Sequence, residues 1–236
     1  MGYFVSNEKF DQIINKMGEK YRVYAPKRFE GQGRYSDTDV IRYDEITSIK
    51  EIVHDVKSTY SAKEVLTPLN QTIMYFTEGK YTESQLKDER DILIFARACD
   101  INAIKRFDDI YLKNGSYEDP YYKRVREKTK FILMECPSNG WDTCFCVSMG
   151  TNKAEEYVFG VKFLEEGVML ENKENEFNEY FSENEEIRKF VSFLEEDIEK
   201  FYYQNNKILS YQNLKSFLDS YIYLDNQKYD FALKYE

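Results

Sequence analysis

Two short apolar runs constrain the fold of this 236-residue chain more than any other feature. They are Ile92–Phe95 and Phe131–Met134, and both lie between polar segments. Apolar runs of this length are typical of buried β-strands. A cysteine follows each run, Cys99 after the first and Cys136 after the second. Since open sheets with parallel strands gather binding sites at the carboxyl ends of the strands, the pattern predicts two thiols at that edge.

The other two cysteines, Cys144 and Cys146, follow Cys136 closely. Side chains one residue apart face opposite sides of a regular strand, so we expect a loop that turns both thiols toward one centre. Four thiolates suit zinc or an iron–sulfur cluster. The spacing matches neither paired zinc ligands nor a ferredoxin run. The residues alone therefore predict a metal centre of open type, and they leave unligated, buried thiols as the alternative.

Three longer segments around these cysteines resemble one protein family. SAKEVLTPLNQTIMYFTEG, ARACDINAIKRFDDIYLKNGSYEDPYYKRVRE and ECPSNGWDTCFCVSMGTN are similar, in order and spacing, to the iron–sulfur electron-transfer subunit of anaerobic sulfite reductase. The wider family includes the beta subunits of soluble sulfhydrogenases, which share the blocks around CDINAI, DPYY and CFCVSMGT. The resemblance implies that this chain relays electrons and has no substrate site of its own.

The cofactor and the partners follow from this resemblance. It implies a cluster-binding role for the four cysteines that match the family blocks: Cys99, Cys136, Cys144 and Cys146. From their number and placement we infer that the four together hold one [4Fe–4S] cluster. It also implies two partners, namely a flavin-containing reductase subunit, which supplies electrons, and a siroheme subunit that reduces sulfite to sulfide. The alternatives are a structural or interaction module with a four-cysteine zinc site, and the beta subunit of a related sulfhydrogenase-type complex. Family members usually continue into a ferredoxin-like part with further cysteines, whereas this chain has none after Cys146.

Composition excludes several other functions. The chain has one histidine, His54, which we expect on a surface helix, so a site with several histidine ligands is excluded within this chain. The net charge is −10, and almost all of it comes from residues after 150, which argues against nucleic-acid binding. The N-terminus MGYFVSNEKF does not resemble a signal peptide, and no apolar run is long enough to span a membrane. We therefore expect a cytoplasmic protein that binds no membrane.

The pattern along the chain predicts an α+β (mixed α/β) fold, with a mixed sheet, flanking helices and a helical, acidic C-terminal segment. We expect a cysteine-bearing domain over residues 1–171 and an acidic helical segment over residues 172–236, which includes a helix at Glu185–Tyr202. An N-terminal helix is expected over Ser6–Tyr21, with Ser6 as its cap. A strand over Tyr21–Ala25 should stop at Pro26, and a charged helical stretch should begin near Ser48.

The segments around the cysteines carry three further expectations. Asp100 should cap a helix that begins beside Cys99, because the positive end of a helix dipole favours a thiolate or an anionic cluster. Asp119 and Pro120 should begin another helix. The basic residues in and after it predict a solvated helix face, with an acidic partner or a nucleotide as the alternative ligand: Lys123, Arg124, Arg126, Lys128 and Lys130.

Overall fold

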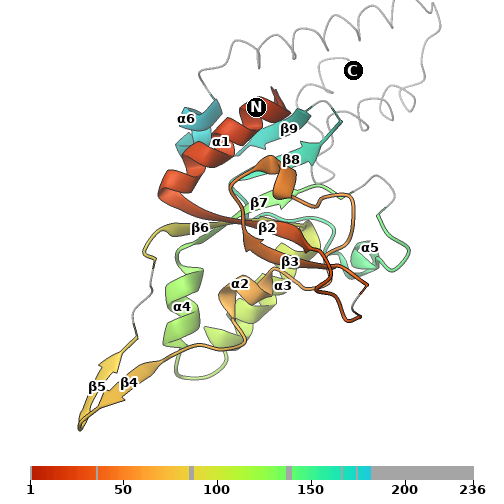
Figure 1. The fold of residues 1–236 in the computed structure, drawn as a ribbon. Coiled ribbons are helices and arrows are strands. Elements are labelled where there is room, and N and C mark those ends of the chain that lie inside the picture. The colour runs from red at the N-terminus through yellow and green to blue at the C-terminus, as the bar shows by residue number, and fades with distance from the viewer. Residues whose placement is uncertain are drawn as a thin grey trace, which may run out of the picture.

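The computed structural model describes residues 2–35, 37–84, 88–136, 140–165, 167–173 and 175–181. A seven-stranded sheet with the order β1-β9-β8-β7-β6-β2-β3 forms its middle layer, and helices cover both of its faces (Figure 1). This arrangement confirms the predicted α+β class. The strands of this sheet are β1 (Gly2–Ser6), β2 (Tyr21–Phe29), β3 (Val40–Glu45), β6 (Asp91–Ala96), β7 (Thr129–Met134), β8 (Phe159–Phe163) and β9 (Gly167–Asn172).

The four central strands, β2, β6, β7 and β8, run parallel, and the strands outside them pair antiparallel. In the register of β6 and β7, Phe95 lies opposite Ile132 and Ala96 opposite Leu133. Every residue of β6 after Asp91 is buried, as is nearly all of β7. Strands covered on both faces need apolar residues at every position, which explains the two continuous runs in the sequence.

Helices lie on both sides of the sheet, with α1 and α6 on one side and α2, α3 and α4 on the other (Figure 1). Side chains that alternate along β6 and β7 enter two separate cores, with Phe95 in the first and Ile94 in the second. The helices are α1 (Asn7–Lys20), η1 (Ile49–Glu51), α2 (Lys63–Leu66), α3 (Ala98–Tyr111), α4 (Pro120–Arg126), α5 (Cys146–Met149), η2 (Asn175–Phe177) and α6 (Asn178–Phe181).

Local signals predicted the starts of two helices correctly. The Ser6 hydroxyl accepts a hydrogen bond from the Lys9 backbone N–H at the start of α1. The Asp119 carboxylate accepts from the first backbone N–H groups of α4, and Pro120 is the first residue of that helix. Helix α1 buries one side, on which apolar residues recur at helical spacing: Phe10, Ile13, Ile14 and Met17.

Three local predictions were wrong. Strand β2 continues through Pro26. The Pro26 carbonyl points away from β3 and accepts a hydrogen bond from the Val53 backbone N–H. The Pro26 nitrogen lies on the same side, where no neighbouring strand needs an N–H donor, so the strand tolerates proline there. The helix expected near Ser48 is only the short turn η1. His54 follows that turn outside any helix, and its ring stacks on Phe163 at 4.5 Å between centroids.

A small hairpin stands away from the main sheet (Figure 1). It consists of β4 (Met74–Thr77) and β5 (Lys80–Glu83), and all of its residues are exposed. An isolated hairpin of this size is only marginally stable in water, so its stability depends on contacts with the rest of the protein.

The packed core continues past Glu171, where the first domain was predicted to end. Phe177, Tyr180 and Phe181 are buried in the same core as α1. The predicted acidic segment 172–236 lies mostly outside the described residues, and the predicted helix at Glu185–Tyr202 lies wholly outside them. Within the described ranges, none of the helices has the length and apolar character needed to cross a membrane.

Candidate metal centre

Two neighbouring parallel strands bring Cys99 and Cys136 to one edge of the sheet. Strand β6 ends at Ala96 and β7 ends at Met134, and these strands are hydrogen-bonded to each other in parallel. Cys99 lies in the first turn of α3, directly after β6, and Cys136 lies just after β7. The prediction that both thiols follow the carboxyl ends of buried strands is therefore confirmed.

Asp100 was predicted to cap α3, but the structure shows that it does not. The helix begins at Ala98 with Arg97 as its N-cap residue, so Asp100 is already inside the first turn. Its carboxylate accepts hydrogen bonds from the Arg97 backbone N–H and from the Ser61 hydroxyl, the latter at 3.1 Å. An acidic residue at the third helical position can reach back to the cap in this way. Cys99 still lies at the positive end of a 14-residue helix.

Cys144 and Cys146 lie in the turn and short helix after residue 140, not in a strand, as predicted. The Cys144 backbone N–H donates to the Trp141 carbonyl at 2.8 Å, and Cys146 is the first residue of α5. Gly150 ends α5 with a φ of +66°, which a residue with a side chain adopts only at a cost. The Cys146 carbonyl accepts from the Thr151 N–H at 2.9 Å, so this turn is closed by backbone hydrogen bonds.

Neighbouring thiols act electrostatically on Cys99 and Cys136. Burial, together with Asp100 and the thiols of Cys136 and Cys146, raises the pKa of Cys99 to about 12, although the Cys99 residue as a whole is exposed to solvent. Burial also raises the pKa of Cys136, and Cys146 and Cys144 add to this effect. Since such interactions weaken with distance, the thiols share one neighbourhood. The described residues nevertheless hold no group of three or more His, Cys, Asp or Glu side chains placed for a metal ion, so joint ligation stays a prediction.

Arg97 is the most unusual charged residue near these thiols. Its side chain is buried, with 5% of the residue exposed, and it has no carboxylate within ion-pair distance in the described part of the chain. The guanidinium donates to the carbonyl oxygens of Glu135 at 3.2 Å and His54 at 2.8 Å. It also lies 4.4 Å from the centroid of the Trp141 ring. Both its charge and a hydrogen bond from it lower the pKa of Cys136, against the effect of burial.

A buried cation that makes no close ion pair is costly, so the surroundings of Arg97 are informative. The Asp100 carboxylate is near enough for the Arg97 charge to lower its pKa, and the guanidinium also places a positive charge beside the Cys136 thiol. The contacts that bury Arg97 come from His54 and Trp141, which are remote in sequence, so no local signal could have identified them.

Glu135 is a second ionisable group next to Cys136. Burial raises the pKa of its carboxyl to about 7, and the Lys162 ammonium, 3.5 Å away, acts against this shift. One carboxyl oxygen is buried without a hydrogen-bond partner in the described residues. The edge of the sheet thus holds a carboxyl that exchanges its proton near neutral pH.

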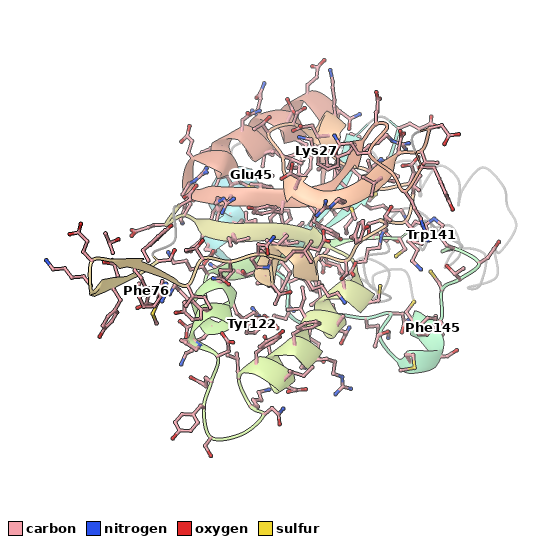
Figure 2. All side chains as sticks on the ribbon, turned by 60° about the horizontal axis from the view of Figure 1, so that its bottom comes forward. Lys27, Glu45, Phe76, Tyr122, Trp141 and Phe145 are labelled. Carbon is pink, nitrogen blue, oxygen red and sulfur yellow. The ribbon has the colours of Figure 1, made fainter. Side chains whose placement is uncertain are left out.

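The outer side of the centre is apolar and open. Phe145, Val147 and Met149 are 70%, 75% and 65% exposed. They lie next to Cys144 and Cys146 in the sequence. Figure 2 shows Trp141 and Phe145 together on one side of the molecule, with Phe76 of the hairpin on the opposite side. Most of the Phe145 side chain faces solvent, so it does not shield the thiols from water.

Contacts to α3 hold the segment that follows α5. The Asn102 side-chain amide donates to the Lys153 carbonyl at 2.6 Å and to the Ala98 carbonyl at 2.9 Å. On the other side of the loop, the Lys57 ammonium donates to the Thr143 hydroxyl at 3.2 Å. These contacts tie the segment with the loop thiols to the helix that carries Cys99 and to the chain after η1.

The residues at this edge fit a thiolate-bound metal or cluster by their chemistry. Four sulfur donors are available, and Arg97 supplies a positive charge that an anionic centre would offset. The raised pKa values of Cys99 and Cys136 mean that these thiols hold their protons at neutral pH, so binding would release protons. This is the chemistry expected of a site that forms together with its metal.

Comparison with known proteins identifies a distant relative. The chain is 28% identical over 197 residues to the sulfhydrogenase 2 subunit beta of Pyrococcus furiosus. The alignment covers 83% of this chain and 54% of the relative, so the chain spans about half the length of that protein. No protein-family model matches the sequence, and no solved structure matches it either. The similarity agrees with the wider resemblance in the sequence and does not single out a sulfite reductase.

Proposed function

We propose that this chain is a non-catalytic electron-transfer subunit of a cytoplasmic oxidoreductase complex. In this proposal one [4Fe–4S] cluster is bound by Cys99, Cys136, Cys144 and Cys146, and the cluster supplies one-electron transfer when bound. The observation that carries the proposal is the buried guanidinium of Arg97, which lies beside the Cys136 thiol and makes no ion pair with a carboxylate within 4 Å among the described residues. A site built for anionic sulfur ligands explains that arrangement.

Each residue of the site then has a defined task. Cys99 and Cys136 present thiolates from fixed positions at the ends of β6 and β7. Cys144 and Cys146 complete the ligand set from the loop. Arg97 stabilises negative charge at the centre, and its stacking contact positions Trp141 beside it. Because hydrogen bonds and nearby charge tune the reduction potential of a cluster, Arg97 is expected to raise that potential.

The partner subunits are the less specific part of the proposal. The relative is named as one subunit of a larger enzyme, which supports a role within a complex. The resemblance in the sequence favours a complex in which a flavin subunit supplies electrons and a siroheme subunit reduces sulfite to sulfide. The exposed apolar side of α5 would let such a partner approach the centre. A sulfhydrogenase-type complex is the second candidate, and the name of the relative favours it.

Metal and sulfide analysis of anaerobically purified protein tests the cluster. We expect about four iron and four sulfide per chain, and visible absorption that bleaches with dithionite. One zinc ion without sulfide would contradict the proposal and indicate a structural module, because zinc is redox-silent and stabilises a fold.

Purification of the native complex tests the partners. Sulfite-dependent oxidation of a reduced dye, together with siroheme absorption, would support the sulfite-reducing complex. Hydrogen-dependent reduction of a dye without siroheme would support the sulfhydrogenase-type complex instead. Recovery of the loaded chain as a monomer with neither activity would contradict a role within a complex.

A further inference from the structure

A pocket of about 590 Å³ lies on the side of the sheet covered by α2 and α4. Its walls come from β2 and β3, from the segment 68–72 that leads to the hairpin, and from α4. Pockets of a few hundred cubic ångströms accommodate small organic ligands. None of the predicted metal ligands lines it, so it is a separate site from the candidate metal centre.

The charged groups on the pocket walls are mostly positive, although the whole chain is acidic. Glu64 and Asp88 are the acidic side chains among the described residues that line it. The basic lining residues are Arg22, Arg42, Arg90, Arg124 and Lys128. Such a concentration of cations in a concave site attracts a compact anion.

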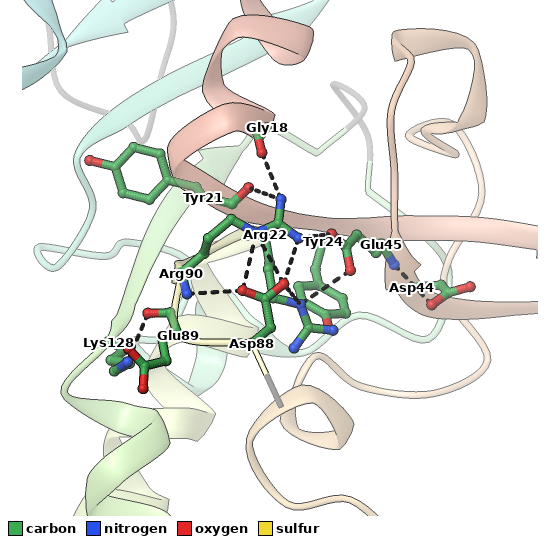
Figure 3. Close-up of polar contacts among 10 residues, drawn as sticks. All are labelled: Gly18, Tyr21, Arg22, Tyr24, Asp44, Glu45, Asp88, Glu89, Arg90 and Lys128. Atoms are coloured by element: carbon green, nitrogen blue, oxygen red, sulfur yellow. Dashed lines mark hydrogen bonds and ion pairs between the residues drawn. The ribbon is translucent and has the colours of Figure 1, made fainter. Parts of the chain in front are cut away.

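Carboxylates hold several of these guanidinium groups in place at the wall. Figure 3 shows Arg90 between two acids, with its Nη2 2.6 Å from Asp88 and 3.2 Å from Glu45, and Arg22 beside them. Arg90 uses its five N–H donors on Asp88, on Glu45 and on the carbonyls of Gly18 and Tyr21, so it keeps none for a ligand. Arg42 and Arg124 each pair with one carboxylate, Glu64 and Glu83, so their guanidinium groups keep donors for a further anion.

Lys128 differs from these arginines. Its ammonium donates to the Glu89 carbonyl at 2.8 Å and makes no ion pair with a carboxylate in the described part of the chain. Its charge is therefore the least compensated in the pocket, and it is the cation on which an incoming phosphate would depend most.

Aromatic side chains line the same pocket. Tyr24, Tyr75 and Tyr121 line it, and the guanidinium groups of Arg22 and Arg124 lie over one ring face of Tyr24 and of Tyr121. The amides of Asn70 and Gln71 supply donors and acceptors. Tyrosine rings stack on planar groups, and side-chain amides form hydrogen bonds with the edges of a base. Cations together with rings and amides match a ligand that has both a phosphate and a heterocycle.

We propose that this pocket binds a nucleotide, with the phosphates on the cationic wall and the base among the tyrosines. The basic stretch in and after α4 had suggested a nucleotide as one alternative, and Arg124 and Lys128 of that stretch line the pocket. The site requires no metal at the cysteines, so it can be tested on the chain whether or not a cluster is present.

Calorimetric titration of the full 236-residue chain with ADP, pyrophosphate and adenosine tests the proposal. We expect ADP to bind more tightly than either pyrophosphate or adenosine, with an affinity that falls as salt rises. Pyrophosphate binding as tight as that of ADP would replace the proposal by a simple anion site. Adenosine binding as tight as that of ADP would show that the cations do not contribute to binding, and would contradict the proposal. Absence of ADP binding at millimolar concentration would overturn it.

Two variants locate the binding. Lys128→Gln and Arg42→Gln should each weaken ADP binding about tenfold, because each loses a charge-assisted hydrogen bond. Arg106→Gln is the matched control, since its side chain is 84% exposed on α3 and does not line the pocket. Unchanged ADP affinity in both pocket variants, with native circular dichroism, would contradict the assignment.

Discussion

The two pairs of cysteines in the candidate metal centre are held in different ways. Cys99 and Cys136 follow central parallel strands whose side chains are buried on both faces of the sheet. Cys144 and Cys146 lie in a turn and a four-residue helix, among side chains that are largely exposed. The first pair is fixed by the fold before any ligand binds, whereas the second depends on a few local hydrogen bonds.

This difference explains how a thiol site can exist without a preformed metal geometry. In the proposed centre, the rigid half would supply the position, and the half with fewer packing contacts would adjust its ligands around the metal. Segments with few buried contacts open locally at low free energy, so the loop thiols should gain most order on binding. We expect the sheet edge to govern whether metal binds and the loop to govern how firmly it stays bound.

Loss of a fixed thiol should have the largest effect. Cys99→Ser and Cys136→Ser should each lower cluster content more than about tenfold after anaerobic reconstitution, because no other sulfur can take that position. Iron and sulfide analysis measures the loss. Thermal unfolding of the metal-free variants serves as the control, and it should stay close to that of the unchanged chain. Cluster content equal to that of the unchanged chain would remove these residues from the ligand set.

Removal of the buried positive charge should come next. Arg97→Gln should lower the reduction potential of the cluster by on the order of 60 mV, a tenfold change for a one-electron couple. It should also destabilise the metal-free chain by about 1–3 kcal/mol, since the half-buried carbonyl groups of Glu135 and His54 lose their donor. Redox titration and denaturant unfolding measure these effects.

Arg106→Gln is the control for the Arg97 variant, because it removes an exposed arginine from the helix that Arg97 caps. Its potential and stability should match those of the unchanged chain. An Arg97→Gln variant with an unchanged potential would contradict the role of Arg97 at the centre, whatever its stability. Arg97→Lys keeps the positive charge but changes the geometry of the hydrogen bonds. Its reduction potential should lie between that of Arg97→Gln and that of the unchanged chain.

Gly150, the residue that ends α5, tests the half of the centre that carries Cys144 and Cys146. Gly150→Ala should cost about 1 kcal/mol, because alanine disfavours the positive φ that ends α5. The cost falls on the loop, so we expect faster loss of iron to a chelator and little change in global unfolding. Gly18→Ala provides the control, since its position leaves room for a methyl group and needs no positive φ. Equal rates of iron loss in both variants would indicate that the loop does not retain the metal.

The smallest effect is expected at the contact between the loop and α3. Asn102→Ala removes the hydrogen bond to the Lys153 carbonyl and should cost about 0.5–1.5 kcal/mol. Amide hydrogen exchange of residues 144–151 should become faster while that of β6 stays constant. A uniform increase across both segments would show that the loop and the sheet edge open as one unit, against their division into a rigid and an adjustable half.

The sequence alone predicted the features that depend on residues close together in the chain. The runs Ile92–Phe95 and Phe131–Met134 predicted buried strands because strands covered on both faces need continuous apolar residues. Ser6 and the Asp119-Pro120 pair predicted helix starts because caps are local. The placement of Cys99 and Cys136 followed directly from the strands that precede them.

Features that depend on remote contacts could not be predicted. Pro26 continues a strand because the side of its missing N–H faces Val53 and not another strand. The burial of Arg97 depends on Trp141 and on the His54 carbonyl. The nucleotide-sized pocket combines β2, the approach to the hairpin and α4, which only the folded chain brings together.

Iron per chain in the Cys144→Ser variant tests the central claim most directly, because Cys144 belongs to the half of the centre that the sheet does not fix. The account predicts a clear loss of iron and sulfide relative to the unchanged chain, measured after the same anaerobic reconstitution. Full cluster occupancy in Cys144→Ser would contradict the assignment of all four cysteines to one [4Fe–4S] cluster.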